Sequence, residues 1–191
     1  MRKAQRTARS FLPIISVLAL IGSLGAAGFV AYTHFASKPT VPIKSIVADI
    51  NTDMFLPLYP LKIMTVYGLE ESTLGDDVRA IARQMNIEVQ ADPEPKRNVF
   101  IRSDQYNFVR HGIPSVMVDI GNNKGSKEAA IEAKWLAERY HAPSDDLNQP
   151  IDKQAAGMFD QFVGRLVERV ANQDARPAWK PSSFFKRYSA N

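Results

Sequence analysis

An uncharged apolar run near the N-terminus constrains the fold of this chain more than any other feature of its sequence. The run extends from Phe11 to Tyr32 without one charged side chain. About 20 consecutive apolar residues are enough for a helix to span a bilayer, so the sequence predicts a single transmembrane segment over residues 11–35. Any folded domain must then be built from the residues that follow.

The flanks of this run predict its orientation. Basic side chains precede the run, and the first one after it is Lys38. This asymmetry predicts a basic cytoplasmic end over residues 1–10 and a remainder placed outside the cell or in the periplasm. Small residues at positions 25–28 also permit a cleaved signal peptide and a secreted product, but the apolar run continues past them, which favours an uncleaved signal anchor. Residues 36–42, which include two prolines, are expected to form a linker.

The formal net charge of +4 is concentrated at the N-terminal end of the chain. The first 39 residues contain five basic side chains and no acidic one, so the rest of the chain is close to neutral. This distribution argues against a nucleic-acid-binding face, and we expect no nucleic-acid partner. Cysteine is absent, which excludes disulfides and thiol chemistry.

A short apolar run that ends in polar residues follows the linker. It extends from Ile46 to Met54 and is too short to form a helix of its own, so it predicts a buried strand with Asp53 at its C-terminal tip. In open α/β sheets, ligands bind outside the carboxyl ends of the strands. Asp53 is therefore the first candidate for a functional side chain.

The rest of the chain alternates short strands with amphipathic helices, which predicts an α/β fold. The apolar stripe Val78, Ile81, Ala82 and Met85 predicts a helix capped by Ser72. A second long stripe predicts a packing helix over residues 151–170. The remaining expected elements are strands over 61–67, 87–89 and 115–120, an extended piece over 98–101, a short helix that begins at Ser103 or Asp104 and ends at Gly112, and a helix over 128–139.

Three motifs in this order resemble a known enzyme family. They are Asn51–Met54, Arg102–Phe108 followed by Gly112–Pro114, and Tyr140–His141 followed by Asp145. Together they resemble the C-terminal half of the secreted and membrane-bound dizinc aminopeptidases, the group that includes glutamate carboxypeptidase. The resemblance covers roughly residues 43–185, with a peptidase-type domain over 43–175 and an irregular tail over 176–191.

The resemblance implies a fold, an activity and a set of site residues. The fold would be a three-layer α/β sandwich, and the activity would be removal of N-terminal residues from extracytoplasmic peptide substrates by two zinc ions. Asp53 and His141 match two metal ligands of the family, and Tyr140 matches a hydrogen-bond donor to the tetrahedral intermediate. A substrate pocket would contain Ser103, Asp104, Gln105, Tyr106 and Phe108, although Gln105 stands where the family usually has histidine.

The other metal ligands of the family should precede Asp53. They are a histidine, a bridging aspartate and a Glu-Glu pair, but only the apolar segment and a linker precede Asp53, and His34 at the expected membrane edge is no substitute. The pair Glu70–Glu71 follows Asp53, and we interpret it as a solvated turn before a helix. Asp53 and His141 bind different zinc ions in the family, so each ion would keep one protein ligand, whereas a catalytic zinc needs three.

We therefore hypothesise that this polypeptide alone is not a competent peptidase, and two further interpretations stay open. The chain could be a membrane-anchored, catalytically inactive binding or assembly module derived from such a peptidase. It could also be the product of a truncated or internally deleted gene. In each case the α/β sandwich would be incomplete, and we expect an exposed sheet edge that a protein partner covers.

Overall fold

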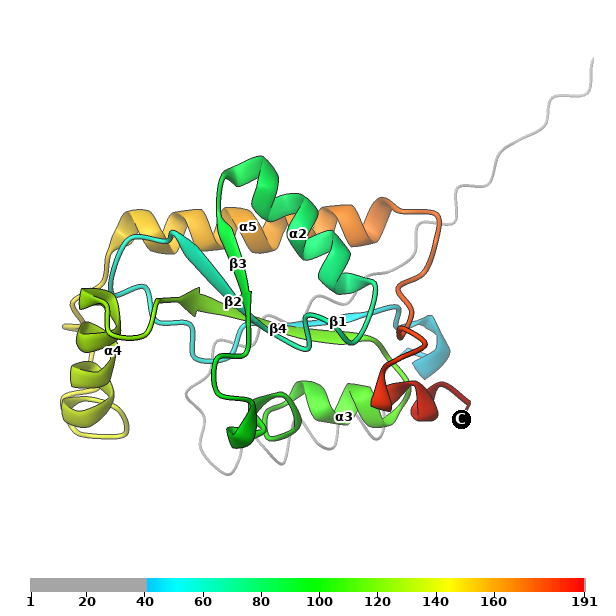
Figure 1. Cartoon of the computed structure of the whole chain (residues 1–191), viewed down its shortest axis with the longest axis horizontal. Helices are drawn as coiled ribbons and strands as arrows, with labels where there is room; N and C mark the ends of the chain where they lie inside the picture. Colours follow the sequence, from blue (N-terminus) through cyan, green and yellow to red (C-terminus); the bar gives the residue numbers. More distant parts are fainter. Residues whose placement is uncertain (1–40, 191) are drawn as a thin grey trace, which may run out of the picture.

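The computed structural model describes residues 41–190, which form a mixed α/β domain around a four-stranded sheet (Figure 1). The strands are β1 (Asp49–Asn51), β2 (Ile63–Tyr67), β3 (Glu88–Ala91) and β4 (Ser115–Gly121), in the spatial order β1-β4-β2-β3. Strand β1 is parallel to β4 and β3 is parallel to β2, while β2 and β4 are antiparallel. The predicted α/β class is confirmed.

The membrane segment expected over residues 11–35 lies outside the described residues. Within residues 41–190, no helix is long and apolar enough to cross a bilayer. Most of the expected linker also precedes the described part of the chain, which begins just before a short 3-10 helix, η1 (Ile43–Ser45).

Helices α2 (Leu74–Met85) and α5 (Lys153–Asn172) cover one face of the sheet (Figure 1). Their apolar stripes are buried against alternate strand residues such as Val66 and Val118, and together they form the main hydrophobic core. Phe159 of α5 is also stacked on Phe55, with ring centroids 4.4 Å apart. Both stripes were predicted from their 3.6-residue period.

The opposite face carries the short helix α3 (Gln105–Arg110) and a smaller apolar cluster (Figure 1). Phe108 and Ile113 are buried there against Ile43 and Ile46. Polar side chains gather on this face because Asp49, Asn51 and Asp119 alternate with the apolar residues of their strands. Helix α4 (Lys127–Glu138) lies beyond the carboxyl end of β4.

Two local expectations are wrong. The segment 98–101, expected to be extended, consists of Asn98, which has a left-handed conformation with φ of 54°, and the 3-10 turn η3 (Val99–Ile101). Another 3-10 turn, η2 (Pro95–Arg97), ends just before it. Ser72 does not cap α2: its hydroxyl is buried without a partner, and its backbone instead forms an isolated bridge with Trp179.

The C-terminal residues 176–190 form an ordered strap that ends in a 3-10 helix, η4 (Phe184–Ala190). The Trp179 indole donates to the carbonyl of Gly112 at 2.9 Å. Arg176 donates to the carbonyls of Lys44 and Ile46 at 2.9 and 3.0 Å. The strap therefore ties the start of the described chain to the segment that follows α3.

Candidate functional site

Asp53 lies just beyond the carboxyl end of β1 and is held in place from two directions. Its backbone N–H donates to the side-chain oxygen of Asn51 at 2.8 Å, which closes a tight turn. Its carboxylate accepts a hydrogen bond of 3.2 Å from the hydroxyl of Ser103. The structure thus joins two of the three motifs on which the resemblance rests.

Gln105 fastens α3 to β1 behind this turn. Its side chain is fully buried, its carbonyl oxygen accepts from the Asn51 amide at 2.6 Å, and its own amide donates to the Phe100 carbonyl at 2.8 Å. Both ends of this amide are used inside the protein, so Gln105 orients the Asp53 turn. One feature of the sequence indicated a special role for this residue: glutamine stands where the family that the chain resembles usually has histidine.

Further carboxylates line the same side of the sheet. Burial, with the negative charge of Asp53 nearby, raises the pKa of Asp104. Burial also raises the pKa of Asp119 to about 8, an effect that the charges of Glu132 and Asp53 reinforce. The pKa of Asp49 rises to about 7, again mainly through burial, with the charge of Asp104 adding to it. Asp53 therefore lies near acidic groups whose pKa values burial raises above their ordinary range.

Sequence reasoning missed Asp49 and Asp119. Their common orientation depends on the strand register, in which Asp49 is opposite Ser115 and Asp119 is opposite Thr65. The alternation of polar and apolar residues within each strand was the signal that could have revealed them.

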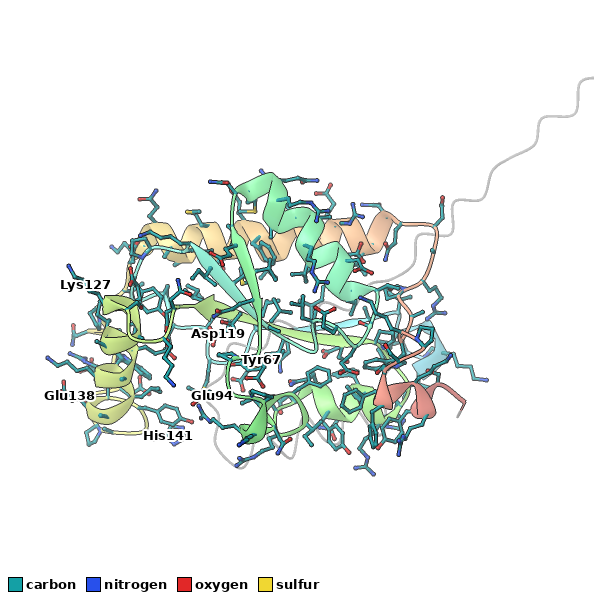
Figure 2. The ribbon with its side chains drawn as sticks, in the orientation of Figure 1. Tyr67, Glu94, Asp119, Lys127, Glu138 and His141 are labelled. Atoms are coloured by element: carbon teal, nitrogen blue, oxygen red, sulfur yellow. The ribbon has the colours of Figure 1, made fainter. Side chains whose placement is uncertain are left out.

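His141 lies just after α4, to one side of the sheet (Figure 2), and Tyr140 directly precedes it in the chain. Both side chains are exposed, and their rings are stacked on each other with centroids 3.9 Å apart. His141 has a left-handed backbone conformation with φ of 56°. The described contacts of His141 and Tyr140 thus join them to each other and to Trp135, and not to Asp53.

The remaining candidates for the substrate pocket have different environments. Ser103 and Asp104 are half-buried beside Asp53. A side-chain hydrogen bond with Tyr188 raises the pKa of the half-buried Tyr106. Phe108, by contrast, is buried in the smaller apolar cluster. The substrate-pocket assignment of these residues stays a prediction.

Comparison with known proteins gives the family. The family model of peptidase family M28 matches residues 21–167. The chain belongs to peptidase family M28. No curated protein and no solved structure matches the chain.

M28 peptidases are in general zinc-dependent, which allows a test of whether the described residues could hold the metal. Among residues 41–190, no three side chains of His, Cys, Asp or Glu are grouped so that they could hold a metal ion. Asp53 has carboxylates and hydroxyls as neighbours, and His141 is engaged with Tyr140. Because zinc in proteins is bound by three or four ligands, this part of the M28 chain does not fit a zinc centre as it stands.

Proposed function

We propose that this protein is a metallopeptidase-type domain of family M28 that meets extracytoplasmic peptides and does not hydrolyse them as this polypeptide alone. The observation that supports the proposal is the surroundings of Asp53. A carboxylate matching a metal ligand is oriented by Ser103 and Asn51, but no second and third ligand join it among the described residues. Without them, no water is activated and no peptide carbonyl is polarised.

The proposal is tested by measuring metal content and turnover on the purified full chain. We expect no stoichiometric zinc and no hydrolysis of an aminoacyl-anilide, and we expect Asp53→Ala to behave like the wild type. Asp160→Ala, at an exposed position of α5, is the control for nonspecific effects. Near two zinc ions per chain, with turnover that Asp53→Ala abolishes and Asp160→Ala preserves, would overturn the proposal.

A second candidate function is a binding or assembly module, and the exposed edge of the sheet favours it. In the described part of the chain, β1 pairs with β4 alone. All three β1 residues are half-buried, and Ile50 packs against the main core at this open edge. An unpaired strand edge is a template for a strand of another protein.

The module interpretation predicts saturable binding of a partner strand along β1. Ile50→Lys places a charge beside the open edge and, in protein that thermal unfolding shows to be folded, should abolish binding of a partner identified by cross-linking. Lys62→Ala, at an exposed position outside the edge strands, should not. Equal cross-linking of wild type and Ile50→Lys would contradict it.

We also propose that residues 11–35 anchor the protein in the membrane as a single-pass segment, with the N-terminus inside and the domain outside. The uncharged run and the basic flank before it support this arrangement. Protease added to intact cells should then degrade the domain. N-terminal sequencing of the mature protein distinguishes the anchor from a cleaved signal, which would give a secreted product.

A further inference from the structure

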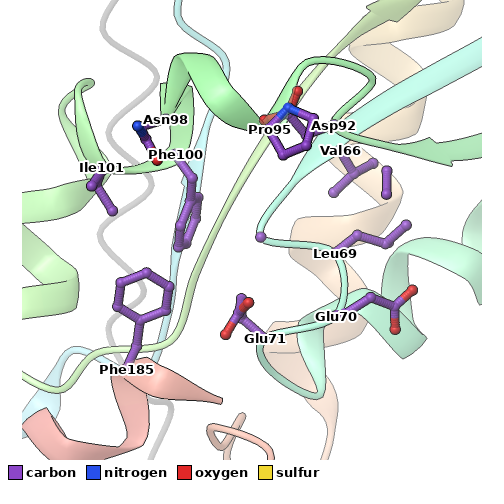
Figure 3. Close-up of a pocket in the computed structure, with 12 residues that line it drawn as sticks. Val66, Leu69, Glu70, Glu71, Asp92, Pro95, Asn98, Phe100, Ile101 and Phe185 are labelled. Atoms are coloured by element: carbon purple, nitrogen blue, oxygen red, sulfur yellow. The ribbon is translucent and has the colours of Figure 1, made fainter. Parts of the chain in front are cut away.

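A cavity of about 330 Å³ opens where the parallel strands β2 and β3 end (Figure 3). Gly68 and Leu69 follow β2, Asp92 follows β3, and both segments line the cavity. The C-terminal strap closes one side with Phe185. A cavity of this size at the carboxyl ends of strands has the dimensions and position of a small-molecule site.

Two aromatic rings form one wall of the cavity. Phe100 and Phe185 meet edge to face with centroids 5.2 Å apart, and Trp179 and Phe184 each contact Phe185 at 5.6 Å. The backbone of Phe100 is fixed because its carbonyl accepts from Gln105. Contacts within the protein thus hold both rings in place, so the aromatic wall exists before any ligand binds.

The residues that line the cavity include three carboxylates and no basic side chain. Two of the carboxylates have cations close to them. Glu70 is paired with Arg79 and lies 3.9 Å from the ammonium of Lys180. Asp92 accepts a hydrogen bond of 2.8 Å from the backbone N–H of Glu94, and the nearby Arg97 is itself ion-paired with Glu94. The charge of Glu70 is therefore balanced by cations, whereas the charge of Asp92 adds to the negative charge of the cavity.

Glu71 is the third carboxylate, and it forms no ion pair with a basic side chain in the described part of the chain. One of its oxygens accepts from the hydroxyl of Ser183 at 2.6 Å, which brings no charge. Figure 3 shows that Glu71 points to the side of its turn that faces Phe185, whereas Glu70 points to the other side. A negative charge without a balancing cation therefore lies beside the aromatic wall.

We propose that this cavity binds a small organic cation, specifically an ammonium group carried on a short apolar stem. The ammonium would meet the carboxylate of Glu71 and the faces of Phe100 and Phe185, since aromatic faces attract cations. The stem would lie against Val66 and Leu69, which are the buried apolar residues of the lining. Anionic and zwitterionic ligands with an exposed carboxylate are disfavoured by the same charge.

The first test is calorimetric titration of the purified full chain with n-butylammonium, with n-butanol as the neutral analogue. We expect saturable binding of the cation and none of the alcohol. Glu71→Gln removes the charge and should weaken binding roughly ten-fold or more, because a hydrogen bond to a charged group is stronger than one to a neutral group. Ser183→Ala keeps the charge but removes the neutral hydrogen bond to Glu71 and the acceptor of the Phe185 N–H, so it should weaken binding less than Glu71→Gln does.

The second test concerns the aromatic wall. Phe185→Leu keeps an apolar side chain but removes the ring, and it should weaken binding of the cation several-fold. Leu147→Ala is the control, because Leu147 is fully exposed and does not line the cavity. Thermal unfolding of each variant shows whether it is folded at the temperature of the titration.

Three results would overturn the proposal: equal binding of n-butanol, undiminished binding by Glu71→Gln, or no saturable binding by the folded wild type. Self-association of the protein through this cavity that n-butylammonium does not reverse would show that the cavity binds a second copy of the chain instead. If n-butylammonium and N-acetyl-lysine amide both bind, the ammonium that the cavity recognises is the side chain of a lysine in a peptide. Binding of butylammonium alone identifies a free amine.

Discussion

Replacing Gln105 by leucine should destabilise the fold and loosen the Asp53 turn at the same time. Leucine has nearly the same size but offers neither the acceptor that Asn51 uses nor the donor that Phe100 uses. Each buried polar group left unpaired costs about 1–3 kcal/mol, so the upper limit is about 6 kcal/mol. The Asn51 amide keeps a long contact of 3.5 Å with Ser103, and we therefore expect a loss of about 2–4 kcal/mol.

Urea unfolding followed by circular dichroism measures this loss directly. In a domain of this size, a loss of about 2–4 kcal/mol lowers the melting temperature by about 4–16 °C. Gln84→Leu, at an exposed position of α2, is the control and should change the free energy of unfolding by less than about 0.5 kcal/mol. If Gln105→Leu unfolds at the same urea concentration as the wild type, the buried amide does not hold β1 and α3 together as described.

Three further perturbations test other parts of the structure. Arg169→Met leaves the buried carboxylate of Asp77 without its 2.8 Å partner, and urea unfolding should show a loss of about 1–3 kcal/mol. The pKa of Asp49 in the folded state, about 7, lies above its ordinary value of 3.8, so the native state binds this proton more tightly than the unfolded state does. The stability conferred by Asp49 therefore falls as pH rises from about 4 to about 7. Asp49→Asn should flatten this part of the pH profile of the melting temperature. Gly112→Ala places a methyl 2.6 Å from a backbone oxygen of the strap at φ of 78°, so it should lower the melting temperature more than Gly125→Ala, which has similar φ and open space around it.

The elements predicted correctly are those whose signal is local. Helices α2 and α5 follow from their apolar period, and β2 and β4 from short apolar runs bounded by turns. The placement of β1 beside β4 depends on a pairing between distant segments, which no local pattern reveals. Ser72 failed as a predicted cap because the strap residue Trp179 pairs with it, a contact that the sequence pattern did not anticipate.

The candidate site was predicted unevenly for the same reason. The motifs around Asp53 and Ser103 meet in the structure, because Asp53 follows β1 and Ser103 precedes α3, and these two elements contact each other. His141 was assigned to the site from its motif alone, and its observed contacts are with Tyr140. Glu71 was interpreted as a solvated turn residue, yet it is half-buried, since the strap covers one side of the turn.

The segment from Phe100 to Gln105 takes part in both candidate sites, and this allows the two proposals to be separated. Ser103 contacts Asp53, while the ring of Phe100 lines the cavity. Gln105 connects the two sites, because its side chain accepts from the Asn51 amide and donates to the Phe100 carbonyl. Gln105→Leu should therefore disturb both places. Glu71→Gln removes a charge from the cavity without touching this network, so it should change cation binding and leave the surroundings of Asp53 intact. Cation binding that survives Asp53→Ala but not Glu71→Gln would show that the cavity works without any metal chemistry at Asp53.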